Sequence, residues 1–138
     1  MLTSLKVIYT MLEEINQSAG NKTELLKKHL NDPIFGKTLK RVLENITDPL
    51  KTFNIKQIRY CVYFDDPIAA EHQHVDGIFN MLDFLSTKQD DPSDEEIAFL
   101  EKISSADPET IEVVVRILNK FSGCGLTNDQ IMKLLKEI

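Results

Sequence analysis

Hydrophobic and polar residues are arranged at helical spacing along most of this chain. Leu5, Ile8 and Leu12, for example, fall on one face of a helix. The same pattern predicts helices at residues 3–18, 22–31, 33–46, 75–87, 94–105, 108–121 and 128–137, and a short one that begins after Asp48. We therefore predict an all-α fold, with residues 1–138 forming a single compact multi-helix domain of about seven to eight helices.

Aspartate precedes every proline, at Asp32-Pro33, Asp48-Pro49, Asp66-Pro67, Asp91-Pro92 and Asp107-Pro108. Aspartate is a good N-cap and proline suits the first helical position, so most of these pairs are expected to start helices. Asp91-Pro92 is instead expected to form a turn, because Ser93 and Glu96 form a capping box directly after it. Thr127 and Gln130 have the same spacing and predict a second capping box.

Residues 53–74 interrupt the helical pattern. The stretch Tyr60-Cys-Val-Tyr-Phe64 is β-prone by composition, whereas Asp66-Pro67 favours the start of a helical turn. A long irregular segment in a compact domain is usually functional or wrongly assigned, so the conformation of residues 57–74 stays open.

Length and composition indicate one globular domain. The chain has 138 residues and a mass of 15.8 kDa, and its 42% of hydrophobic residues can fill a sizeable core. No apolar run is long enough to cross a membrane, and the N-terminus lacks the features of a signal peptide. Cys61 and Cys124 do not make a disulfide framework. We expect a cytoplasmic monomer with reduced thiols and no membrane partner.

The charge is distributed unevenly along the chain. The net charge of −6 argues against a simple nucleic-acid binder. However, residues 22–59 hold nine Lys/Arg against four Asp/Glu, whereas residues 65–112 hold fourteen acidic residues against two lysines. Residues 113–138 are again net positive. The middle and the C-terminus are therefore candidates for one basic face, although solvated helix faces that alternate in sign remain the alternative.

A glycine-containing turn near the C-terminus is the first candidate site. The turn Gly123-Cys-Gly125 separates a helix that carries Arg116 and Lys120 from a helix that restarts at Thr127. The glycines allow a tight turn and close approach to another molecule, and free amides at a helix start suit a phosphate. The alternatives are an ordinary helix hairpin with a glycine C-cap, and an Arg116 that binds a buried carboxylate or helix-end carbonyls.

The second candidate site follows a basic helix that carries Lys37, Lys40 and Arg41. A Thr-Asp-Pro turn leads from that helix into the segment Lys51-Thr-Phe-Asn-Ile-Lys56. Lysine, threonine and asparagine side chains near a helix start can contact phosphate oxygens. Phe53 is expected to anchor the segment in the core rather than to stack on a base.

These motifs resemble those of a known family. Leu39-Lys-Arg-Val-Leu43, followed by Asp48-Pro-Leu-Lys-Thr-Phe-Asn-Ile-Lys56, resembles the N-terminal DNA-binding domain of bacteriophage ATP-dependent DNA ligases. Met81-Leu-Asp-Phe84 and the stretch from Arg116 to Gly125 are similar to the same family, in the family's order. The family often has an Asp-Leu pair where this chain has Phe121-Ser122, and residues 57–74 do not match clearly.

The resemblance implies an all-α domain that grips the minor groove of nicked double-stranded DNA without base-sequence preference and helps the catalytic core of the same ligase to encircle the nick. It implies a host-cell cytoplasmic location if the chain is viral. Residues carried over from the two motifs as DNA-binding candidates are Lys51, Thr52, Lys56, Arg116, Lys120, Ser122, Gly123, Gly125 and Thr127, with Lys37, Lys40 and Arg41 as secondary candidates. We expect the two turns to lie side by side and to form one cradle for a sugar–phosphate backbone.

We expect neither catalytic nor metal-binding residues in this chain. Ligation needs a lysine nucleophile in a Lys-x-Asp-Gly setting, and neither this tetrapeptide nor a phosphate-binding loop motif occurs. ATP and Mg²⁺ are expected only for a downstream catalytic core. His72 and His74 lack a third ligand nearby, and the acidic residues 90–96 lack the EF-hand spacing. The alternative function is a helical protein-interaction module that uses its acidic segment, residues 65–112.

Overall fold

The computed structural model describes residues 4–53, 75–87, 91–104 and 108–137. Within these ranges it contains seven helices and no strand. The helices are α1 (Ser4–Gln17), α2 (Lys22–Leu30), α3 (Gly36–Thr47), α5 (Val75–Thr87), α6 (Asp94–Ser104), α7 (Pro108–Leu118) and α8 (Asn128–Lys136). The prediction of an all-α fold in a single compact domain is confirmed.

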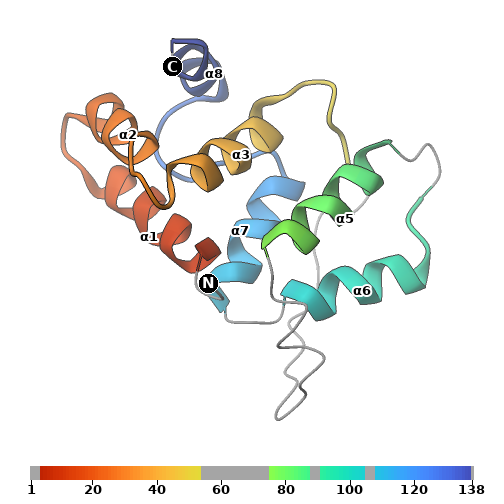
Figure 1. Cartoon of the computed structure of the whole chain (residues 1–138). Coiled ribbons are helices and arrows are strands. Elements are labelled where there is room, and N and C mark those ends of the chain that lie inside the picture. The colour runs from red at the N-terminus through yellow and green to blue at the C-terminus, as the bar shows by residue number, and fades with distance from the viewer. Residues whose placement is uncertain (1–3, 54–74, 88–90, 105–107, 138) are drawn as a thin grey trace.

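Helix α7 lies in the middle of the molecule, where it contacts α1, α3 and α6 (Figure 1). Helix α3 also contacts α1, α2 and α8, so that segments from the middle and the end of the chain adjoin. Helices α5 and α6 form a pair on the other side of α7 from α1 and α2 (Figure 1). This arrangement places the basic helices α2, α3 and α8 together and the acidic helices α5 and α6 apart from α2 and α8.

The core consists of aliphatic side chains from the inward faces of these helices. The largest contributions come from α1 and α7, with Leu5, Ile8, Leu12 and Ile15 on the first and Val113, Val114, Ile117 and Leu118 on the second. Burying each large side chain contributes roughly 1.5–3 kcal/mol. Phe53 is 4% exposed and belongs to this core, which confirms its predicted role as an anchor. Among the described residues, no helix has the length and apolar character that crossing a membrane requires.

Both predicted capping boxes are present. The amide of Glu96 donates to Ser93 Oγ at 3.2 Å, and the amide of Ser93 donates to Glu96 Oε1 at 3.1 Å. At the start of α8, the amide of Gln130 donates to Thr127 Oγ1 at 3.1 Å, and that of Thr127 donates to Gln130 Oε1 at 2.8 Å. Each box satisfies two amides that the helix leaves without an internal acceptor.

The Asp32-Pro33 pair does not start a helix, which corrects the prediction made from its sequence. Asp32 Oδ1 accepts hydrogen bonds from the amides of Ile34 and Phe35, each at 2.8 Å, and stabilises a turn. These two bonds hold the pKa of Asp32 below its usual value. Helix α3 begins only at Gly36, after this turn.

The Asp48-Pro49 pair forms a turn in the same way. The amide of Leu50 donates to Asp48 Oδ1 at 2.9 Å, and residues 49–53 are not helical. The expectation that a short helix begins directly after Asp48 is therefore wrong. The remaining predictions for this part of the chain lie outside the described residues, including those for Lys56, Cys61, Asp66-Pro67, His72 and His74.

Gly36 occupies a position that has no room for a side chain. A Cβ at Gly36 would lie 2.4 Å from the carbonyl oxygen of Leu30. Replacing Gly36 with Ala should therefore lower the free energy of unfolding by about 1–3 kcal/mol, because the backbone of α2 must move. Urea denaturation followed by circular dichroism measures this change.

Gly77→Ala is the matched control. A Cβ at Gly77, within α5, would have no atom within 4 Å, so Gly77→Ala should raise the free energy of unfolding by up to about 1 kcal/mol. Equal unfolding midpoints for the two variants would contradict the packing described at Gly36.

Candidate nucleic-acid interface

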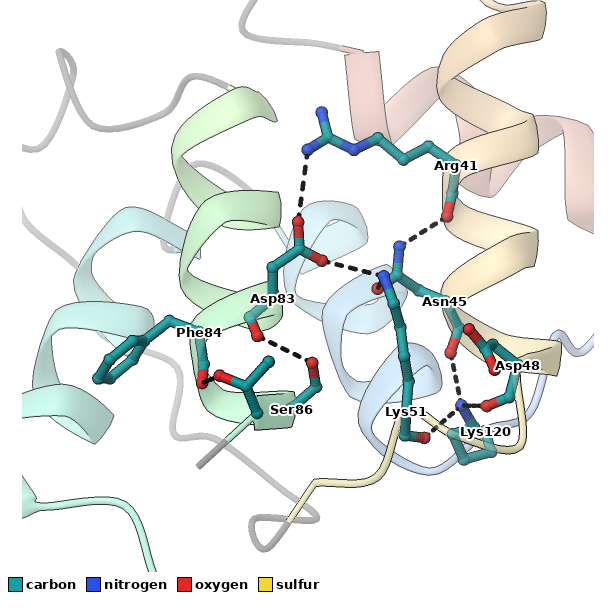
Figure 2. A network of polar contacts seen from close by, with 9 residues as sticks. Arg41, Asn45, Asp48, Lys51, Asp83, Phe84, Ser86 and Lys120 are labelled. Atoms are coloured by element: carbon teal, nitrogen blue, oxygen red, sulfur yellow. Dashed lines mark hydrogen bonds and ion pairs between the residues drawn. The ribbon is translucent and has the colours of Figure 1, made fainter. Parts of the chain in front are cut away.

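The two turns that the sequence singled out lie side by side. We call residues 48–52 the first turn and residues 119–127 the glycine turn. Lys120 Nζ donates to the carbonyl oxygens of Asn45, Asp48 and Lys51, each at 2.7 Å (Figure 2). These carbonyls include the end of α3, which carries the negative end of the helix dipole and attracts a cation. One ammonium group thus joins the two turns.

The backbone of Lys120 is adapted to this contact. Its φ of 57° lies in the left-handed region, which is uncommon for a residue other than glycine. Helix α7 therefore ends at Leu118 rather than at residue 121 as predicted, because the chain reverses at Asn119 and Lys120. The strain of order 1–3 kcal/mol is offset by the three charge-assisted hydrogen bonds of the ammonium group.

Lys51 and Arg41 contact acidic residues of α5. Lys51 Nζ lies 3.0 Å from Asp83 Oδ1 and 3.2 Å from Asn45 Oδ1 (Figure 2). Arg41 lies 3.2 Å from Asp76 and 3.8 Å from the second oxygen of Asp83. The side chains of Lys51 and Arg41 remain 31% and 39% exposed, so these pairs contribute little to stability, about 0–1 kcal/mol each.

Arg116 is enclosed by groups of its own chain. Its guanidinium lies 2.7 Å from a carboxylate oxygen of Glu13 and 3.1 Å from one of Glu112, and it donates to the carbonyl oxygen of Ser122 at 3.1 Å. Burial alone would lower the pKa of Arg116, but the hydrogen bonds that its guanidinium donates to Glu13 and Glu112 outweigh the effect of burial and raise the pKa above its usual value. The side chain is 11% exposed. The geometry thus favours the structural role for Arg116, which fastens the glycine turn to α1.

Both glycines of the turn adopt left-handed conformations close to long side chains. Gly123 has φ 71° and Gly125 has φ 88°. A Cβ at Gly123 would lie 2.6 Å from Arg116 Nη1, and one at Gly125 would lie 2.7 Å from Lys22 Cε. Ser122 is 2% exposed, and its Oγ lies 3.2 Å from Cys124 Sγ, so its side chain faces the interior rather than a ligand.

The surface of the glycine turn presents polar backbone. Among the residues that the structure describes, no acceptor faces the amides of Gly123, Gly125 and Leu126. Thr127 Oγ1 is already engaged in its capping box. These groups border a hollow of about 800 Å³ lined by Glu13, Asn16, Arg116, Lys120, Phe121, Gly123, Gly125, Leu126, Thr127 and Asn128. The hollow is large enough to receive a phosphate group.

The two helices that border the first turn, α3 and α8, carry accessible lysines. Lys37 and Lys40 on α3, and Lys133 and Lys136 on α8, make no ion pair within the described ranges. Lys40 and Lys136 line opposite sides of a groove of about 300 Å³ between α3 and α8. Thr52 is exposed at the end of the first turn. Sequence reasoning missed Lys133 and Lys136, although their spacing of three residues places them on one helix face.

No protein-family model, curated protein or solved structure matches this chain. Among the described residues, no group of three or more His, Cys, Asp or Glu side chains is placed to hold a metal ion.

Replacing Lys120 with Met tests the contact between the turns. Met keeps the aliphatic stem and the backbone strain but removes the donors, so Lys120→Met should lower the free energy of unfolding by about 2–3 kcal/mol. Chemical denaturation measures the change. The exposed Lys133 provides the control, because Lys133→Met should change stability by less than about 0.5 kcal/mol. Equal stability of the two variants would mean that the ammonium of Lys120 does not hold the turns together.

Proposed function

We propose that this chain binds the sugar–phosphate backbone of duplex DNA around a nick, without base-sequence preference. It would do so as the non-catalytic N-terminal domain of an ATP-dependent DNA ligase. The observation that carries the proposal is the contact of Lys120 with three carbonyl oxygens. This contact joins the two turns, and the sequence motifs of both turns resemble those of that family. Lysine side chains and exposed amides are the groups that contact phosphates in such complexes.

The contacts divide the predicted residues into two groups with different roles. Lys120, Arg116 and Ser122 are engaged inside the protein and position the turns. The phosphate contacts are assigned to the groups that stay accessible, which are Lys37, Lys40, Thr52, Lys133, Lys136 and the amides of Gly123 and Gly125. Lys51 and Arg41 lie beside this surface, and each forms an ion pair with Asp83.

The distribution of charge supports one orientation on DNA. Helices α2, α3 and α8 are each net positive, whereas α5 and α6 are each net negative. A duplex is attracted by the first group and repelled by the second, so the long-range field turns the α3–α8 side toward the phosphates. The net charge of −6 keeps binding elsewhere on the surface weak.

The proposed domain does not itself join DNA. A downstream catalytic core would supply the nucleophilic lysine, ATP and Mg²⁺. Binding of this chain to a nicked duplex should therefore need neither ATP nor Mg²⁺, and a mobility shift in the presence of a chelator is a direct measurement of it.

The decisive measurement compares two exposed lysines. Lys37→Glu should weaken binding to a nicked duplex about tenfold at low salt and reduce the dependence of log Kd on log salt by about one, because one phosphate contact is lost. Lys6 on α1 is also exposed and lies outside the proposed surface, so Lys6→Glu changes the net charge equally and should alter binding much less. Fluorescence anisotropy over a range of salt concentrations gives both quantities.

Two results would contradict the proposal. The first is that the unaltered chain does not bind nicked duplex DNA at low salt. The second is that Lys6→Glu weakens binding as much as Lys37→Glu does, since binding would then follow the total charge rather than a defined surface.

A second candidate function uses the acidic helices α5 and α6. Phe84 on the acidic helix α5 is 53% exposed, which favours a helical protein-interaction module built on the acidic segment. In that case a basic partner would bind α5 and α6, and Phe84→Ala would weaken it while Lys37→Glu would have no effect. The mobility shift with nicked DNA distinguishes the two functions.

A further inference from the structure

Each of the two joined turns carries a large apolar side chain in water. Leu50 in the first turn is 88% exposed, and Phe121 in the glycine turn is 63% exposed. Leaving such a side chain in solvent forgoes roughly 1.5–3 kcal/mol of burial. Both residues lie in turns rather than on a helix face.

The backbones of the two residues are held close together. Leu50 lies between Asp48 and Lys51, whose carbonyl oxygens both accept hydrogen bonds from Lys120, and Phe121 directly follows Lys120. A single lysine side chain therefore spans the space between the two turns. Leu50 and Phe121 are thus each next in sequence to a residue of the Lys120 contact.

The backbone on both sides of the junction is fixed by hydrogen bonds. The amide of Leu50 donates to Asp48 Oδ1 at 2.9 Å, and that of Phe121 donates to the carbonyl oxygen of Arg116 at 2.9 Å. These bonds restrict the backbone from which the two side chains project. Leu50 and Phe121 are thus pre-organised in an exposed position, which lowers the entropic cost of contacting a ligand.

We propose that Leu50 and Phe121 enter the minor groove at the nick and pack against the deoxyribose rings and the loosened base step there. The inference rests on the proposed function and adds to it the origin of the preference for a nick. Proteins that bind the minor groove insert apolar side chains such as Leu and Phe between base steps at a cost of a few kcal/mol for unstacking. A broken backbone makes the step easier to open, so the nicked site costs less than intact duplex.

The surroundings of the two side chains favour this ligand over an apolar protein surface. Lys40 and Lys136, together with Glu44 and Asp48, line the groove next to Pro49, and Gly123 and Gly125, whose amides are free, line the same hollow as Phe121. Lysine side chains and amides near the two apolar residues are groups that contact phosphates, which run along both edges of a minor groove. An apolar protein partner would instead need a continuous apolar patch, whereas here polar backbone and Lys120 separate the two side chains.

The test uses the double variant Leu50→Ala/Phe121→Ala and a nicked duplex with 2-aminopurine beside the nick. The variant should bind the nicked duplex about tenfold more weakly and lose most of its preference over intact duplex. Its salt dependence should not change, because no phosphate contact is removed. The 2-aminopurine fluorescence should rise with the unaltered chain, through unstacking, and stay low with the variant.

Ile34→Ala is the matched control. Ile34 is 71% exposed at the turn before α3, away from the junction, so its truncation should change neither affinity nor fluorescence. Because all three side chains are exposed, the variants should keep the fold, which circular dichroism verifies.

The possible results distinguish the apolar contact from the proposed binding of DNA. Unchanged affinity and fluorescence in the double variant, together with weakened binding by Lys37→Glu, would overturn the apolar contact and leave the DNA-binding function intact. A rise in fluorescence that persists in the double variant would also overturn it. Loss of effect in both Lys37→Glu and the double variant would overturn the two proposals together.

Discussion

The ammonium group of Lys120 holds the glycine turn against the end of α3 and the first turn. Its three acceptors belong to the end of α3 and the first turn, and its own residue opens the glycine turn, so one side chain sets the distance between two segments about seventy residues apart. Arg116 completes the arrangement by binding Glu13 on α1. Lys22 repeats the device at the end of α1, where it donates to the carbonyl oxygens of Ile15, Asn16 and Ser18. Long cations thus bind carbonyl oxygens at the C-terminal ends of α1 and α3.

The use of cations inside the molecule explains which parts of the site were predictable. Lysine and arginine next to a turn bind oxygen atoms that carry negative charge, and a helix-end carbonyl and a phosphate both meet that description. The sequence around Lys120 therefore identified a residue that binds anionic oxygens but not whose oxygens they are. Only the three-dimensional arrangement assigns Lys120 to carbonyls and leaves Lys37 and Lys40 without an ion partner in the described chain.

The helices could be predicted from the sequence because the signals that start and end them are local. The capping boxes at Ser93 and Thr127 need only residues three positions apart, and the apolar spacing of α5 predicted both of its ends. Asp32-Pro33 carries the same local signal as a helix start, because an aspartate can cap a helix or close a turn with the same carboxylate, and here it closes a turn. The sequence pattern predicts an end of α7 at residue 121, three residues beyond the observed end at Leu118, because the reversal at Lys120 depends on acceptors from a distant segment.

The close approach of Gly123 to Arg116 links the evolution of two positions. The space in which a side chain at 123 would stand is filled by the guanidinium, and the guanidinium is in turn held by Glu13. A lineage that acquires a larger residue at 123 must therefore also shorten or redirect the residue at 116, and the acidic residue at 13 then loses its counter-charge. Positions 13, 116 and 123 should therefore covary as a set among relatives.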